Sequence, residues 1–459
     1  MSHALVPSPR RSAALAPLLP LAPLLPLVPA LPLVAVVALT GLPSAGDGAG
    51  PADVVSALVA GYCVIRLLRD RRRPLSPRAA VVLGLPVVGL ALAAMGAASP
   101  QAALGGLCRY LQIFVLVPAA VLVLLRGRTG FRALVWSFVG LALWQGVVGT
   151  HQYVTGTGAS YQGETVRAVG TFGAQDVMGM ATAVSLGVVC AAGIALGRAP
   201  VWQRTAAAGC ALVLVLPLAL SFSRGAWIAT ALTCAVQLAL AGLRRALKVA
   251  AAVVAAGVVL MGGFGVGTAM LQERIDSITE VTDTPDQSVV DRYTLWAAAT
   301  GMWREHPWTG VGLKNFPEYR DGHATLALSS GSDIEGAGEE YHKQALLSPH
   351  SMYLLVLSEQ GLIGLLALAG SWLALLVCAL RRLLRARSRG PGLDCALVAV
   401  GLLLWLLTDF VYGDIGGPST VLTGMALGLT AWWALSRDDR ADAAPRDGAP
   451  ACLEETAAR

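Results

Sequence analysis

Long apolar stretches alternate with short polar or basic stretches along almost the whole chain. We assign twelve apolar segments, at about residues 27–42, 52–68, 79–97, 103–125, 131–149, 176–196, 205–221, 226–242, 249–269, 351–380, 393–411 and 418–435. Most of them approach the roughly 20 residues that a helix needs to cross the apolar core of a bilayer. The pattern therefore predicts an all-α, polytopic membrane protein with about twelve transmembrane helices.

The first segment follows an unusual proline pattern. Proline recurs at every third position, at Pro17, Pro20, Pro23, Pro26, Pro29 and Pro32. Proline inside a helix costs about 3 kcal/mol, so residues 1–26 are predicted to form an extended, proline-rich segment, with a helix starting near Pro29. A cleaved signal peptide is the alternative, because Arg10 and Arg11 precede the apolar run. We favour an uncleaved membrane anchor.

Composition supports the membrane class. Of the 459 residues, 55% are hydrophobic and 14% are charged, whereas soluble domains carry roughly 25% charged residues. The net charge of +6 does not indicate nucleic-acid binding, because the basic residues stand in short runs between apolar segments and form no patch interleaved with aromatics. No nucleic acid is expected as a partner; the lipid bilayer is.

Lysine and arginine divide unequally between alternate loops. One set of loops, with both termini, carries 25 of the 34 basic residues; the other set carries 8, and Arg109 lies within a segment. Basic residues favour the cytoplasmic side. This predicts a multi-pass protein of the inner or plasma membrane with both termini cytoplasmic. Residues 27–269 then hold nine helices, 351–435 hold three, and 436–459 form a cytoplasmic tail.

The predicted extracytoplasmic side has two polar loops, at about 150–176 and 270–350. The larger loop carries thirteen acidic and six basic residues. Within it, residues 291–305 suit an amphipathic helix, whose Tyr293, Trp296 and Met302 or Trp303 are expected on the bilayer surface. Residues 328–340 are predicted to form a loop. Neither CxxC or Cys/His spacing nor a DxD cluster occurs, so we expect no metal site and no cofactor.

Three residues near the predicted outer membrane boundary are candidates for chemistry. His350 precedes a long apolar segment and would titrate near neutrality as a general base; the structural alternative is a helix-start residue. Arg224, between two apolar segments, suits a bidentate phosphate contact or is an arginine that reaches water from its helix end. Arg167 is the third, with a plain loop charge as its alternative. Arg109 would pair with Asp176, Asp409 or Asp414, or add to a phosphate site.

Together these residues form a combination that none indicates alone. Arginines and a histidine gather at one membrane boundary from segments far apart in the sequence. Arginines there would hold a lipid-anchored pyrophosphate and stabilise it as a leaving group, while the histidine takes the proton of an acceptor hydroxyl. Without an acidic metal cluster, the arginines would do the work of a divalent cation.

Four motifs occur in order beside the expected segments: RAVGTFG (167–173), SRGAWIA (223–229), HPWTGVGLKNF (306–316) and PHSMYLLVLSEQGLIG (349–364). Their order resembles the O-antigen ligase and O-antigen polymerase superfamily, with a large outer loop in a GT-C-like architecture. The resemblance implies metal-free, inverting transfer of a glycan from an undecaprenyl-pyrophosphate-linked donor to a glycan or glycolipid acceptor. It implies that Arg167 and Arg224 hold the pyrophosphate and that His350 activates the hydroxyl. Further substrate-binding candidates are Arg109, Tyr161, Lys314, Asn315 and Glu359.

The sequence is compatible with more than one function. Within the superfamily, a ligase attaches a finished glycan and a Wzy-type polymerase joins repeat units, and the motifs are common to both. A transporter or flippase of lipid-linked glycans is the non-enzymatic alternative. That class places ionisable residues at mid-membrane, whereas the intramembrane charges here stand near the predicted outer ends of the segments. We therefore favour the enzyme.

Overall fold

The structure is a computed structural model that describes residues 27–43, 50–70, 75–161, 164–173, 176–242, 287–336, 339–389 and 392–436. The predicted segments 1–26 and 249–269 and the tail after residue 436 lie outside these ranges. The helices before residue 243 are α1 (Leu31–Leu39), α2 (Pro51–Asp70), α3 (Pro77–Met95), α4 (Pro100–Leu111), η2 (Gln112–Leu116), α5 (Val117–Leu124), α6 (Gly127–Thr155), η3 (Gly170–Phe172), α7 (Gly179–Leu196), α8 (Val201–Val213), α9 (Val215–Leu220) and α10 (Arg224–Ala241). The later helices are α13 (Gln287–Glu305), α14 (Phe316–His323), α15 (Met352–Arg389), α16 (Leu393–Asp409) and α17 (Thr420–Leu435).

Eight helical stretches among the described residues are long and apolar enough to cross a membrane. They are Pro51–Arg69, Pro77–Met95, Pro100–Leu124, Gly127–Thr155, Gly179–Leu196, Val201–Leu220, Arg224–Ala241 and Met352–Ser388. The chain is therefore a multi-pass membrane protein of mainly helical structure. The predicted count of twelve is not reached in the described ranges, partly because the first segment forms only the nine-residue α1.

Serine and proline set the starts of several helices. Pro77 and Pro100 stand in the first turns of α3 and α4, where the missing proline N–H costs nothing. The Ser76 hydroxyl accepts a hydrogen bond from the N–H of Ala79 at 3.2 Å, and Ser99 caps α4 in the same way. Such caps satisfy N–H groups that have no partner within the helix.

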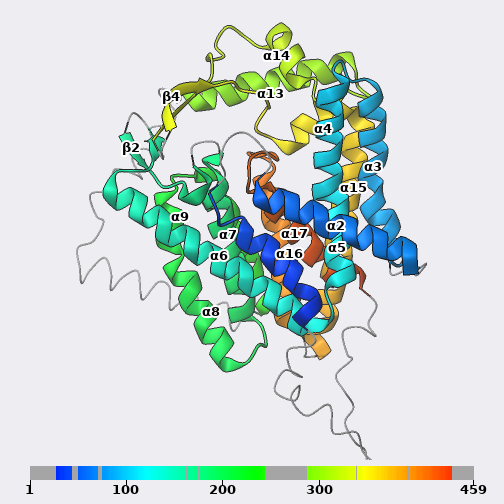
Figure 1. Ribbon diagram of the computed structural model, residues 1–459, viewed down its shortest axis with the longest axis vertical. Helices are drawn as coiled ribbons and strands as arrows, with labels where there is room; N and C mark the ends of the chain where they lie inside the picture. Colours follow the sequence, from blue (N-terminus) through cyan, green and yellow to red (C-terminus); the bar gives the residue numbers. More distant parts are fainter. Residues whose placement is uncertain are drawn as a thin grey trace, which may run out of the picture.

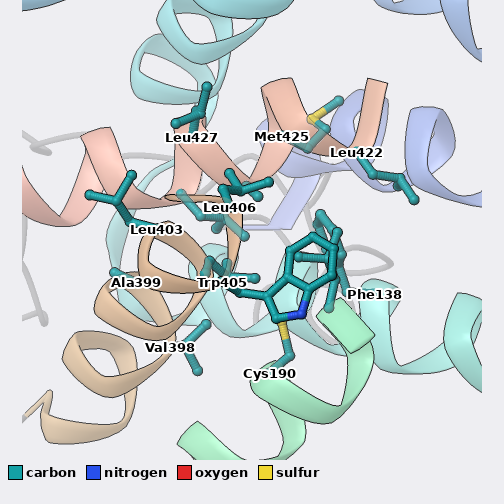
Figure 2. Packing of buried hydrophobic residues seen from close by; sticks show 14 of the residues in the cluster. Phe138, Cys190, Val398, Ala399, Leu403, Trp405, Leu406, Leu422, Met425 and Leu427 are labelled. Atoms are coloured by element: carbon teal, nitrogen blue, oxygen red, sulfur yellow. The ribbon is translucent and has the colours of Figure 1, made fainter. Parts of the chain in front are cut away.

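The centre of the bundle is formed by α7, α16 and α17, whose side chains are almost all buried. Trp405 of α16 packs in this core with Phe138 and Cys190 (Figure 2). Its indole N–H donates to the Thr230 hydroxyl of α10 at 3.0 Å. Gly193 of α7 lies directly against Val398 of α16, because a small residue lets two helix backbones approach closely.

A layer of non-spanning structure covers one end of the bundle, which we call the sheet end. There α13 and α14 lie across the helices, with β2 and β4 beside them (Figure 1). The sheet has the order β2-β1-β3-β4, and its paired strands are antiparallel. Its strands are β1 (Ala159–Tyr161), β2 (Glu164–Arg167), β3 (Ser332–Gly336) and β4 (Glu339–Gln344).

The prediction of a loop at residues 328–340 is wrong. This stretch contains β3 and the start of β4. The two strands pair with each other, and Gly336 of β3 also lies opposite Ala159 of β1. A strand can form in such a polar, glycine-containing sequence because β4, the next strand in the chain, pairs with β3 along its length and β1 adds one further pair from more than 150 residues away.

The helix predicted at 291–305 is confirmed as α13, although its apolar residues face the protein and not the bilayer surface. Leu295, Ala298 and Met302 are fully buried and form a second small core with α15. Met302 therefore faces the protein, which excludes it from the expected choice of Met302 or Trp303 on the bilayer surface. Tyr293, by contrast, remains 64% exposed.

Helix α15 is broken at Gly361, and the glycine-rich loop at 306–316 packs against this break. Gly361 has φ 64° and ψ −166°, a conformation that residues with a Cβ adopt only with strain. The loop supplies replacement hydrogen bonds, because the N–H of Leu362 donates to the Pro307 carbonyl at 2.9 Å and the N–H of Val311 donates to the Ser358 carbonyl at 2.8 Å. The loop therefore docks onto α15 through its backbone.

Gly361→Ala is expected to destabilise the protein. The new Cβ would collide with the backbone of Trp308, and the left-handed φ alone costs about 1–2 kcal/mol. We expect the melting temperature in detergent to fall by roughly 5 °C or more. Gly370→Ala in the same helix is the matched control, since nothing lies within 4 Å of the added Cβ, and it should leave the melting temperature unchanged or slightly higher. Equal melting temperatures for the two variants would contradict this account of the break.

Candidate active site

Arg224 is the first residue of α10, at a sharp turn that follows α9. Phe222 in this turn has φ 51°, and the Ser223 hydroxyl caps α10 by accepting from the N–H of Ala226 at 3.3 Å. The Arg224 side chain is exposed. The free N–H groups and the positive end of the dipole at a helix N-terminus attract anions, and an exposed arginine at the same place adds a full positive charge.

Arg167 reaches the same turn from the sheet. It ends β2, and its Nε donates to the Ser221 carbonyl at 3.1 Å. The next residue, Ala168, donates its N–H to the Leu220 carbonyl at 3.2 Å. These bonds fix the end of β2 against the α9–α10 turn, so Arg167 and Arg224 stand at one place although 57 positions separate them in the sequence.

The loop between α16 and α17 connects this turn to the start of α15. Tyr412 lies against α10, because a Cβ added at Gly225 would be 3.7 Å from the Tyr412 Cβ. The N–H of Met352 at the start of α15 lies 3.0 Å from the Phe410 carbonyl and 2.9 Å from the Gly413 carbonyl, and it donates to both. The loop therefore touches the arginine turn on one side and the residues that follow His350 on the other.

His350 stands just before α15 in a left-handed conformation, with φ 49°. The preceding carbonyl, of Pro349, accepts a hydrogen bond from Trp296 Nε1 of α13 at 2.9 Å. Burial lowers the pKa of His350 from its usual 6.5, and Arg292 lowers it further, while Asp414 and Asp291 act in the opposite direction. A lowered pKa keeps the imidazole neutral near pH 7, which is the state that accepts a proton.

Arg292 and Asp414 surround this histidine but were absent from the predicted site. Arg292 belongs to α13, and burial is the main cause that lowers its pKa, while Tyr412, Asp414 and Asp409 raise it. Asp414 lies on the α16–α17 loop, and its Oδ2 is buried without a hydrogen-bond partner among the described residues. A weak signal for Arg292 was present in the sequence, since it is one of the few basic residues in the predicted outer loops.

Arg109 belongs to a different contact. It forms an ion pair with Asp53 of α2 and donates from Nη2 to the Gly417 carbonyl at 3.2 Å. Asp53, which was not among the three expected partners, is 5% exposed. Of those three, Asp176 instead accepts from the N–H of Ser419 at 2.9 Å. The Arg109 contacts hold α2, α4 and the α16–α17 loop together.

Lys314, Asn315 and Glu359 form a separate cluster around the break in α15. The Asn315 side chain donates to the Val311 carbonyl at 2.7 Å and to the Gly96 carbonyl at 3.2 Å, so it ties the loop to the end of α3. Glu359 is buried, and its Oε1 accepts from the N–H of Phe316 at 3.3 Å. At about 1.5 Å per residue, Glu359 lies about 10 Å along α15 from its start. These contacts favour a structural role.

Tyr161 ends β1 and lies opposite Glu164 of β2. Its side chain is outside the described part of the structure. Within the described residues, no group of three or more histidine, cysteine or acidic side chains is placed to hold a metal ion. The structure thus brings Arg167, Arg224 and His350 to one region at the sheet end. Arg109 contacts the α16–α17 loop of this region through the Gly417 carbonyl, whereas Lys314, Asn315 and Glu359 have their contacts elsewhere.

An apolar groove opens beside the arginine turn. It has a volume of about 420 Å³ between α6 and the α8–α9 segment, with Thr150 and His151 among its few polar lining residues. Leu216 and Pro217 in its wall precede Arg224 by eight and seven positions. The wall of the groove therefore continues along α9 to the turn that carries Arg224.

Comparison with known families gives one match. Residues 208–369 match the Wzy_C family model, described as O-antigen ligase. The matched range runs from α8 into α15 and includes Arg224, Arg292 and His350, whereas Arg167 precedes it. No curated protein matches the chain. The resemblance to this superfamily is thereby confirmed for residues 208–369.

Proposed function

Because residues 208–369 form an O-antigen ligase family domain, we propose that this protein is a metal-independent membrane glycosyltransferase. It moves a glycan from an undecaprenyl pyrophosphate carrier to an acceptor hydroxyl on the extracytoplasmic face. The observation that carries the proposal is the meeting of β2, the α9–α10 turn and the α16–α17 loop, which gathers Arg167, Arg224 and His350.

The reaction assigns one task to each group. The neutral His350 imidazole takes the proton of the acceptor hydroxyl as its oxygen attacks the anomeric carbon. The bond between that carbon and the pyrophosphate oxygen breaks, and the configuration inverts because attack comes from the opposite face. Arg167 and Arg224 stabilise the negative charge that develops on the leaving pyrophosphate, and Arg292 contributes a third positive charge beside His350. The polyprenyl chain lies in the groove between α6 and α8–α9.

The orientation follows from charge. Loops rich in lysine and arginine favour the cytoplasmic side of a membrane. The arginine-rich connections alternate along the chain with the connections at the sheet end, so the sheet end faces away from the cytoplasm and both termini are cytoplasmic. On the side opposite the sheet, Arg132 at the start of α6 pairs with the buried Asp394 at the start of α16. Both helices start on the side opposite the candidate active site.

Transfer by the purified protein in nanodiscs tests the function. The assay combines a lipid-pyrophosphate-linked glycan with candidate acceptors and excess EDTA. Glycan transfer that survives the chelator supports the proposal, and loss of transfer that Mg²⁺ restores would refute metal independence. Movement of the lipid-linked glycan without transfer would favour a transporter.

Ligase and polymerase forms of this function differ in their cellular products. A strain that lacks a ligase retains full-length chains on the lipid carrier, whereas a strain that lacks a polymerase retains single repeat units. We favour the ligase form, in agreement with the description of the matched family. Accumulation of single repeats on deletion of the gene would assign the polymerase form instead.

Asp414→Asn is expected to move the acid limb of the pH–rate profile to lower pH. In the native protein, the rate should fall as the pH drops through the His350 pKa, which lies below 6.5. The Asp414 carboxylate raises this pKa, so its removal lowers the pKa further. The measurement is kcat/KM between pH 4.5 and 8. Asp321→Asn on the exposed surface of α14 is the control, and an unchanged or upward-shifted limb in Asp414→Asn would contradict the assignment of His350 as the base.

A further inference from the structure

Three aromatic rings form a continuous series at the sheet end. Tyr293 and Trp296 of α13 meet edge to face, with ring centroids 5.8 Å apart and planes at 88°. Trp296 and Tyr412 follow at 6.1 Å and 44°. Tyr293 is 64% exposed and Tyr412 is 45% exposed. The series therefore presents aromatic surface to the outside of the protein instead of closing into a core.

Two contacts fix the series between the parts of the candidate active site. The Trp296 indole N–H donates to the Pro349 carbonyl, next to His350, at 2.9 Å. Tyr412 lies against Gly225, next to Arg224. A ligand that covers the rings would thus have His350 on one side and the arginine turn on the other.

We propose that Tyr293, Trp296 and Tyr412 bind the sugar ring that bears the acceptor hydroxyl. This inference deepens the proposed function and rests on it. One face of a pyranose carries mainly C–H groups, which pack on the electron-rich face of an aromatic ring. Two χ angles fix each aromatic side chain, so little conformational entropy is lost when a sugar binds.

Polar groups beside the rings match the hydroxyl groups of a sugar. Asp414 stands two positions after Tyr412, and its buried Oδ2 has no hydrogen-bond partner among the described residues. Arg292, one helical turn before Trp296, lies close enough to the Asp414 carboxylate for that charge to raise the pKa of the guanidinium. An acceptor and a donor at the edge of an aromatic surface provide both parts of a saccharide subsite, an apolar face and directional hydrogen bonds.

The competing explanation is that these aromatics anchor the protein at the membrane interface. An interfacial tryptophan directs its N–H to water or lipid head groups, whereas the Trp296 N–H is already used by the Pro349 carbonyl. Arg292 and Asp414 near the rings also favour a hydrated ligand. We therefore commit to a saccharide as the occupant.

The test measures saccharide binding without the donor. Nanodisc-embedded protein is applied to a microarray of microbial surface oligosaccharides, and the strongest binder is then titrated. Tyr293→Leu and Tyr412→Leu remove one ring each while keeping an apolar side chain, and Tyr293→Phe and Tyr412→Phe keep the ring. Tyr319→Leu on α14, with a tyrosine that is 36% exposed, is the matched control.

We expect each leucine variant to bind roughly fivefold more weakly, while the phenylalanine variants and Tyr319→Leu bind as the native protein does. In transfer assays, the leucine variants should raise KM for the acceptor and leave KM for the lipid-linked donor unchanged. Absence of binding to any saccharide, or equal binding by the leucine variants, would overturn the proposal. Aromatic-dependent binding without any transfer would instead support the subsite and refute the proposed enzyme activity.

Discussion

Replacing His350 with asparagine is expected to reduce the rate of glycan transfer by about 10²- to 10⁴-fold, the usual contribution of a general base. Asparagine is the informative substitution because His350 has φ 49°, a conformation that asparagine tolerates better than most residues. The variant should therefore fold normally and lose only the imidazole. Initial rates at saturating donor and acceptor, with the melting temperature measured in parallel, provide the check.

His323→Asn serves as the control for this loss. His323 ends α14, and its Nε2 lies 3.2 Å from Glu305 Oε1, so the substitution removes a histidine from the same end of the molecule but outside the candidate active site. Its transfer rate should stay within about twofold of the native rate, as for most substitutions away from a site. If His350→Asn also keeps the native rate, the histidine is not the base, although the proposed glycan transfer would still stand.

Arg224→Ala is expected to lower kcat by about 10²- to 10³-fold, comparable to the loss of one group that stabilises a developing negative charge. Arg224→Lys should retain part of the rate, because lysine keeps the charge but lacks the planar, bidentate guanidinium. The measurement is kcat with a pyrophosphate-linked donor. The ordering native, lysine variant and alanine variant, from fastest to slowest, is the specific expectation.

The stability of Arg224→Ala should distinguish a functional from a structural role. A positive charge in the first turn of a helix is unfavourable because it opposes the helix dipole, and the Arg224 side chain is exposed. The alanine variant should therefore unfold at the native temperature or slightly above it while losing activity. Arg304→Ala, at the exposed end of α13, is the control with an unchanged rate. A large loss of stability in Arg224→Ala would indicate that the arginine holds the turn and not the substrate.

The α16–α17 loop contacts both the turn that carries Arg224 and the start of α15 after His350. Tyr412 contacts the arginine turn, and the Phe410 and Gly413 carbonyls hold the start of α15. Because one loop contacts both parts, the distance between His350 and the arginine turn depends on backbone hydrogen bonds in addition to the candidate side chains. This arrangement is consistent with the precise orientation that group transfer requires.

The amino-acid sequence by itself determined the class of the protein and most of its helices. Runs of about 20 apolar residues allow few structures except membrane helices, so the predicted segments 52–68 and 79–97 agree closely with Pro51–Arg69 and Pro77–Met95. Serine caps before Pro77 and Pro100 set helix starts through contacts only three residues apart. The order of the motifs was sufficient to indicate the family that residues 208–369 match.

Only the tertiary structure decided which of the candidate residues meet. Arg167 bonds to a carbonyl 54 positions away, Arg109 pairs with Asp53 across 56 positions, and Trp296 holds Pro349 across 53. Where a loop was predicted, β3 pairs with β4 and also joins the distant β1 at Gly336. Helix periodicity and capping depend on residues within one or two turns, so a sequence displays them directly. Contacts over such separations depend on how whole helices pack, which no local pattern records.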